Sequence, residues 1–180
     1  IGTGQQYNNP IRNVASVMLN LALHGKPPVI YGTGAQRRAY TPWEDIERPV
    51  LELILDPERR FDGLTVNIGP GPQVSMSLIE LATLCYSTAH RLTGRVITPE
   101  THPFRHVDPG GSVASMHTAV CSDRRYRMLF GRVPEPNYEH VLHEMGQAML
   151  ERPLDFDYSF VRKADLGPKG YPAFLRTHRL

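Results

Sequence analysis

The sequence predicts a mixed α/β fold on three observations. Runs with an apolar stripe at helical spacing, as in residues 14–22 and 137–151, alternate with short β-branched or aromatic runs, as in residues 29–31. Capping residues and helix-stopping glycines separate these runs. Alternation of this kind is typical of α/β proteins. Hydrophobic content of 41% with 21% charged residues is ordinary for one globular domain of 180 residues, or for one domain with an appendage.

The first third of the chain is organised around a glycine turn. Residues 1–13 are rich in Gly, Gln and Asn and are expected to form a loop before the first helix. That helix is expected to end at Gly25, and residues 29–31 to form a strand. The turn at residues 32–34 leads into an extended segment that contains Arg37 and Arg38. Neighbouring side chains of an extended segment point to opposite faces, so one of these two arginines can face a cleft while the other faces water.

The rest of the chain is expected to continue the alternation. Thr41 and Glu44 have the spacing of a capping box, with Pro42 at the first helical position, so a helix is expected to start there and to end before Asp56. Ser77 and Glu80 form a second capping box. The remaining expected elements are strands at 64–68, 95–98 and 116–121, helices at 77–92, 122–130 and 137–151, and a long loop at 99–112. Residues 1–152 are predicted to form the folded part, and residues 153–180 a C-terminal tail.

Composition argues against several classes of protein. A net charge of +2 does not support nucleic acid as the main partner. No apolar run approaches eighteen residues, so no membrane span is predicted. Cys85 and Cys121 are isolated and are expected to be buried thiols in a reducing, cytoplasmic compartment. The first residue is Ile1 rather than Met, so we expect a preceding segment to have been removed or to lie outside this piece.

Four motifs resemble one family when they are taken in order. They are G-T-G-Q with R-N-V within residues 2–14, Y-G-x-G-x-Q-x-R at residues 31–38, N-I-G at residues 67–69 and S-x-x-E-L at residues 77–81. Their order and spacing resemble the extended short-chain dehydrogenase/reductase family, and in particular its NAD-dependent nucleotide-sugar epimerases and dehydratases of the UDP-glucose 4-epimerase kind. The resemblance covers residues 1–150 and the C-terminal, substrate-binding part only. It implies a small mixed α/β substrate-binding domain whose Rossmann half is missing from this chain.

The resemblance also implies the chemistry of a parent protein. NAD would take hydride from the sugar of a UDP-sugar and return it to the opposite face. The Tyr-x-x-x-Lys pair and the glycine fingerprint for NAD are absent from these 180 residues, so no catalytic or cofactor-binding residue is predicted here. The chain alone is expected to be inactive. The full-length parent is expected to be cytoplasmic and able to form a homodimer through helices of its missing half.

The predicted site residues bind substrate. The resemblance places Arg38 at the position of the family arginine on the diphosphate, and a guanidinium meets phosphate as a bidentate fork. Arg37 is then expected to face outward. Arg105 lies in a P-x-R motif that resembles a second phosphate ligand, and it could also be an ordinary loop residue. Val14 and the strand Val29, Ile30 and Tyr31 would line the base pocket, or simply the core. Asn13 could be a helix cap or a ligand contact.

Other functions stay open at the level of sequence. His140 and His143 are three positions apart and lack the His-Glu-x-x-His pattern, so a metal site is not predicted. Within the enzyme family, a dehydratase or a decarboxylase is the near alternative to the 4-epimerase. An alternative from another class is a regulatory module that has kept the sugar-nucleotide pocket and lost NAD.

Overall fold

The computed structural model describes residues 1–5, 13–31, 33–96, 105–107 and 118–151. Its elements, in chain order, are α1 (Val14–Leu23), β1 (Val29–Tyr31), β2 (Arg37–Arg38), α2 (Trp43–Ile54), the 3-10 turn η1 (Pro72–Val74), β3 (Met76–Ser77), α3 (Leu78–Thr93), β4 (Arg105–Val107), β5 (Thr118–Ala119), α4 (Arg124–Phe130) and α5 (Tyr138–Glu151). The predicted mixed α/β class is confirmed. The predicted tail 153–180 and most of the predicted loop 99–112 lie outside the described residues.

Two small sheets carry the strands. β1 pairs in parallel with β4, and β2 is the central strand of the second sheet, with β3 antiparallel on one side and β5 parallel on the other. Each sheet therefore joins an early strand to one that comes much later in the chain. In the register of these strand pairs, Val29 lies opposite Arg105, and Arg38 lies opposite Met76 on one side and Ala119 on the other.

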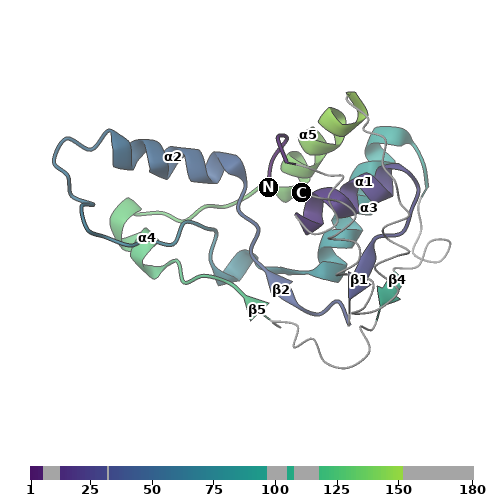
Figure 1. The fold of residues 1–180 in the computed structure, drawn as a ribbon, viewed down its shortest axis with the longest axis horizontal. Coiled ribbons are helices and arrows are strands. Elements are labelled where there is room, and N and C mark those ends of the chain that lie inside the picture. Colours follow the sequence, from purple (N-terminus) through teal and green to yellow (C-terminus); the bar gives the residue numbers. More distant parts are fainter. Residues whose placement is uncertain (6–12, 32, 97–104, 108–117, 152–180) are drawn as a thin grey trace, which may run out of the picture.

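A layer of three helices, α1, α3 and α5, forms the core beside these strands (Figure 1). Its fully buried side chains include Leu19 from α1, Leu81 and Cys85 from α3, and Leu142 from α5, and Ile30 of β1 joins the same cluster. Burying a side chain of this size contributes about 1.5–3 kcal/mol relative to leaving it exposed. The helix layer is therefore the main source of stability for the described fold.

Two of the predicted helix signals are confirmed and one is wrong. Ser77 accepts a hydrogen bond from the Glu80 N–H at 3.1 Å, the Glu80 carboxylate accepts one from the Ser77 N–H, and α3 ends at Gly94 with φ of 68°. The predicted box at Thr41 does not form, because Pro42 is extended, with ψ of 152°, and itself takes the N-cap position. The free N–H of Trp43 is satisfied instead by the Ile1 carbonyl at 2.9 Å.

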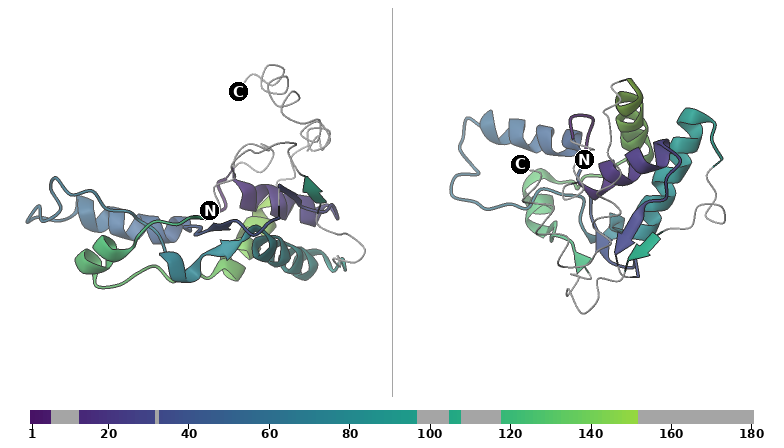
Figure 2. Two further views of the ribbon diagram at one scale, coloured as in Figure 1. Left: turned by 90° about the horizontal axis from the view of Figure 1, so that it is seen from below. Right: turned by 45° about the vertical axis from the view of Figure 1, so that its right-hand side comes forward.

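Helices α2 and α4 lie side by side at one end of the molecule, away from the helix layer (Figures 1 and 2). We call α2, α4 and the connecting segment 55–71 the α2–α4 lobe. Its interior is held by the stacked rings of Phe61 and Phe130, 5.5 Å apart, and by buried Tyr126. An ion pair between Arg132 and Glu52 joins the segment after α4 to α2.

The strand predicted at 64–68 is wrong. These residues are irregular and cross the lobe, where Arg125 donates a hydrogen bond to the Thr65 carbonyl. Leu64 is 47% exposed, and within the described residues this segment has neither a partner strand nor a buried residue. Residues 95 and 96, the described part of the strand predicted at 95–98, are irregular as well.

The expectation of two buried thiols is half right. Cys85 is fully buried in the helix layer, and Cys121 is exposed just after β5. Burial raises the pKa of the Cys85 thiol, because the thiolate would be desolvated.

Thiol labelling should therefore separate the two cysteines. We expect Ellman's reagent at pH 8 to modify Cys121 in the native protein and to reach Cys85 only after unfolding in guanidinium chloride. A Cys121→Ser variant should lose the native reaction entirely. Native reaction of both thiols would show that the helix layer opens readily.

Candidate functional site

The candidate site is built on the turn between β1 and β2. Gly34 has φ of 74°, and a Cβ at this position would lie 2.7 Å from Cγ1 of Ile79 and 3.0 Å from Cγ2 of Ile30. The Gly34 carbonyl accepts hydrogen bonds from the N–H groups of Leu78 and Ile79 at the start of α3. Only glycine meets both the backbone conformation and the close approach. The turn therefore fixes where β2 begins relative to α3.

Arg37 is already held by acceptors of the protein. Its guanidinium donates to the hydroxyl and to the carbonyl of Ser75, and it forms an ion pair with Glu80 at 3.1 Å. Arg37, which was expected to face outward, is partly exposed and ties β2 to the start of α3 through these contacts. The hydrogen bonds with Ser77, together with the Arg37 charge, hold the pKa of Glu80 below its usual range.

Arg38 differs from Arg37 in its partners rather than in its exposure. It is half-buried in the central strand, and its guanidinium donates to the Arg37 carbonyl at 2.8 Å. Among the described residues no carboxylate forms an ion pair with Arg38. Its remaining N–H donors can therefore serve an anionic ligand, because a guanidinium carries five donors.

Tyr40 is a neighbour of Arg38 that the sequence analysis did not single out. Its carbonyl accepts a hydrogen bond from the Tyr138 hydroxyl at 2.7 Å, and its own buried hydroxyl has no hydrogen-bond partner in the described part of the chain. Burial raises the pKa of Tyr40 to about 12, although the charge of Arg38 acts in the opposite direction. The two-residue spacing from Arg38, which places both side chains on one face of an extended segment, was the signal available in the sequence.

The structure brings Arg105 to the other predicted strand. Arg105 opens β4 and pairs in register with Val29, so the backbone of Arg105 lies against β1. Arg38 and Arg105 are on strands of different sheets.

The side chain of Ile30, in the middle of β1, is fully buried and belongs to the core. Any contact of Ile30 with a base would therefore use its main chain.

Asn13 and Val14 lie at the start of α1. Asn13 occupies the N-cap position with φ of 57°, but its side chain makes no capping hydrogen bond. Its carbonyl accepts hydrogen bonds from the Ser16 hydroxyl at 2.9 Å and from the Val17 N–H. Val14 is 36% exposed. Both side chains are therefore available at the surface, and Asn13 is not the side-chain cap that was one of its two interpretations.

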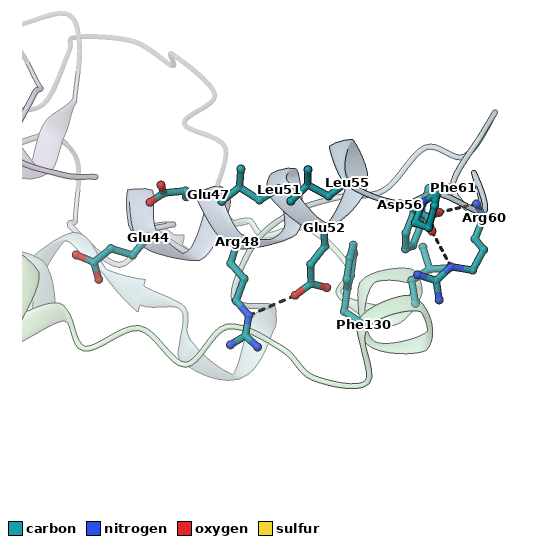
Figure 3. A pocket seen from close by; sticks show the side chains of 12 residues that line it. Glu44, Glu47, Arg48, Leu51, Glu52, Leu55, Asp56, Arg60, Phe61 and Phe130 are labelled. Atoms are coloured by element: carbon teal, nitrogen blue, oxygen red, sulfur yellow. Dashed lines mark hydrogen bonds and ion pairs between the residues drawn. The ribbon is translucent and has the colours of Figure 1, made fainter.

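A cavity of about 630 Å³ lies in the α2–α4 lobe and contains none of the predicted site residues (Figure 3). Its charged side chains largely neutralise one another: Arg48 pairs with Glu52 at 3.3 Å, and Arg60 with Asp56 at 3.0 Å. It therefore does not provide the unpaired cation that a phosphate ligand would need. Arg38 remains the better centre for the candidate site.

The described residues contain no cluster of three or more His, Cys, Asp and Glu side chains arranged to hold a metal ion. None of their helices has the length and apolar character needed to cross a membrane.

No family model and no curated protein matches this sequence. Solved structures do. An epimerase from the methanogen Methanothermobacter thermautotrophicus matches with a TM-score of 0.62 and 22% identity over 91% of this chain. The UDP-glucose 4-epimerase of Thermotoga maritima, solved with UDP-glucose, matches with a TM-score of 0.63 and 17% identity over 84%. The dTDP-glucose 4,6-dehydratase of Bacillus anthracis, solved with NAD, matches with a TM-score of 0.61 and 18% identity over 87%.

The chain spans 43% of the length of each of these three proteins. The matching structures include epimerases and a dehydratase, so the match shows a shared fold and not a shared reaction. The resemblance stated from the sequence motifs is thus confirmed at the level of fold. This chain has the fold of part of these epimerases and dehydratases.

Proposed function

We propose that this chain is the nucleotide-sugar-binding part of an NAD-dependent UDP-hexose 4-epimerase, with Arg38 as a ligand of the diphosphate. The proposal rests on the difference in bound partners between Arg37 and Arg38, the two residues of β2. Arg37 is occupied by Ser75 and Glu80, whereas Arg38 is half-buried with no ion-pairing carboxylate in the described structure. A half-buried cation next to a rigid glycine turn is a suitable phosphate ligand, because its geometry is fixed before the ligand arrives.

The second part of the proposal concerns β1 and β4. Their register brings the backbone of Arg105 against β1, and we assign Arg105 as a second diphosphate ligand. Val29, Ile30 and Tyr31 would read the uracil edge through their main chain, with Val14 and Asn13 at the rim of the base pocket. Ligand pockets of this type are mainly apolar, with a few polar groups that fix orientation.

The residues that the structure describes do not fit an NAD site. A dinucleotide fingerprint needs a strand that runs through a glycine-rich turn directly into a helix. In the described residues the Gly34 turn joins two strands instead, and α3 follows β3 with no glycine between them. NAD, which supplies hydride transfer in such enzymes, would be held elsewhere in the parent protein. The role of this chain is to position the sugar, and correct positioning of a reactant lowers the barrier without any group here reacting.

The dehydratase of Bacillus anthracis has the same fold, so a dehydratase or decarboxylase of this family is the alternative reaction. A regulatory module that binds sugar nucleotides without NAD is the alternative from another class. Both alternatives use the same substrate site.

Calorimetric titration of the protein with sugar nucleotides tests the shared proposal. We expect saturable binding of UDP-glucose, competition by UDP, and no binding of free glucose at the same concentrations, because the diphosphate and the base supply the contacts. Tighter binding of dTDP-glucose than of UDP-glucose would favour the dehydratase. Absence of binding by any of these nucleotides would contradict the proposal.

A further inference from the structure

The chain that follows Arg38 leaves the sheet at once. β2 is two residues long, and its last residue, Arg38, pairs with Met76 on one side and Ala119 on the other. Residues 39–42, which lead to α2, have no strand partner in the described part of the chain. The direction in which the backbone leaves Arg38 is therefore set by contacts other than strand pairing.

A side chain of α5 holds this segment at Tyr40. The Tyr138 hydroxyl donates a part-buried hydrogen bond to the Tyr40 carbonyl at 2.7 Å, and the two residues are 98 positions apart in the chain. The neighbouring Thr41 carbonyl accepts a hydrogen bond from the Ile1 nitrogen, which comes from the N-terminal segment and not from the core. Two residues of extended chain span about 7 Å, so the bond at Tyr40 acts on the backbone close to Arg38.

Tyr138 is itself held by the helix layer. It is the first residue of α5, and its ring packs against the hydrophobic core of that layer. The preceding residue, Asn137, accepts a hydrogen bond from the His140 N–H through its side chain at 3.1 Å, and the following residue, Glu139, pairs with Arg91 of α3 at 2.8 Å. The start of α5 therefore presents the Tyr138 hydroxyl from a defined position.

The hydroxyl also keeps the proton that this bond needs. A carbonyl has no proton to give, so Tyr138 must be the donor and must stay neutral. Burial raises the pKa of Tyr138 to about 12, and the bond to the Tyr40 carbonyl acts in the opposite direction. The ring of Tyr40 packs against the same core as the ring of Tyr138. The segment after Arg38 is thus fastened to the helix layer by a ring contact and by a hydrogen bond.

We propose that Tyr138 is a positioning residue of the candidate site, and that its bond to the Tyr40 carbonyl sets the direction in which Arg38 meets the diphosphate. This inference rests on the proposed function for the role of Arg38. Tyr138 touches no substrate, and its effect passes through the backbone of residues 38–40. A side chain that is ordered before the ligand arrives lowers the entropy cost of binding, because the ligand does not have to order it.

A double-mutant cycle tests the inference by calorimetric titration with UDP-glucose. The four proteins are the wild type, Tyr138→Phe, Arg38→Ala and the double variant. Tyr138→Phe removes one oxygen and keeps the ring that packs on the core, and circular dichroism checks that each variant is folded. We expect Tyr138→Phe to weaken binding by about threefold to tenfold, the range of an ordinary hydrogen bond. In the Arg38→Ala background the same change should alter the affinity by less than about twofold, because no arginine is left to position.

Tyr126→Phe is the matched control. It removes the same oxygen from a buried tyrosine of α4, whose hydroxyl is hydrogen-bonded to the Arg132 side chain in the α2–α4 lobe. This variant should be less stable than the wild type in urea and should bind UDP-glucose with unchanged affinity. A loss of affinity equal to that of Tyr138→Phe would show that any lost tyrosine hydroxyl has this effect, and would overturn the inference.

The remaining outcomes separate this inference from the proposed function. Unchanged affinity in Tyr138→Phe would overturn the positioning role and leave Arg38 as a diphosphate ligand. An equal loss in both backgrounds would also overturn it, since Tyr138 would then act independently of Arg38. A wild-type protein that does not bind UDP-glucose would overturn the proposed function and the positioning role together.

Discussion

Replacement of Arg38 by alanine should weaken the binding of UDP-glucose by about tenfold or more. A hydrogen bond to a charged group contributes about 1.5–3 kcal/mol, and about 1.4 kcal/mol corresponds to a tenfold change in affinity. The loss should fall on binding rather than on folding, because the one described side-chain hydrogen bond of Arg38 goes to the adjacent Arg37 carbonyl. Calorimetric titration of the variant with UDP-glucose measures the effect, and circular dichroism confirms that the variant is folded.

Two further variants are controls for the Arg38→Ala measurement. Arg124→Ala removes the same charge from an exposed position at the start of α4 and should leave the affinity unchanged. Arg38→Lys keeps the charge and loses the planar fork, so it should recover only part of the affinity. An Arg38→Ala protein that binds UDP-glucose as tightly as the wild type would remove Arg38 from the site.

Substitution of Gly34 by alanine should strongly destabilise the described fold. Two costs combine: a left-handed φ costs a residue with a Cβ roughly 1–2 kcal/mol, and the overlap with Ile79 and Ile30 adds about 1–3 kcal/mol of overpacking. We expect the free energy of unfolding, measured by urea titration, to fall by about 2–5 kcal/mol.

Gly63 provides the matched control for this loss. It has φ of 73°, close to that of Gly34, but a Cβ built there meets no atom within 4 Å. Gly63→Ala should therefore show the cost of the backbone conformation alone, and the difference between the two variants measures the close approach at the turn. Equal losses would mean that Ile79 and Ile30 move aside freely.

Local signals in the sequence predicted the elements that depend on local chemistry. Ser77 and Glu80 bond to one another within a single turn, and Gly94 ends α3 through its own φ, so neither needs information from elsewhere in the chain. The apolar stripe at 14–22 likewise predicted α1 because its period is a property of the helix itself. These elements account for most of the helix layer.

The features that could not be predicted depend on residues far away in the chain. The β-branched pattern at 64–68 suits a strand, but a strand also needs a partner, and Arg125 takes the Thr65 carbonyl instead. The sequence indicated that the side chains of Arg37 and Arg38 point to opposite faces. It could not show that Arg37 binds Ser75 and Glu80, because these residues lie about forty positions away in the chain.

The strand pairings determine when the candidate site can form during folding. Val29 pairs with Arg105 and Arg37 pairs with Thr118, so each pairing joins residues more than seventy positions apart. Contacts between such distant residues form slowly, because the entropy of closing a long loop must be overcome before the contact stabilises anything. During synthesis, the strand of Arg38 therefore stays without β5 until residue 118 has left the ribosome. The helices α1 and α3 can form before then, whereas the candidate site is complete only after residue 118 has been made.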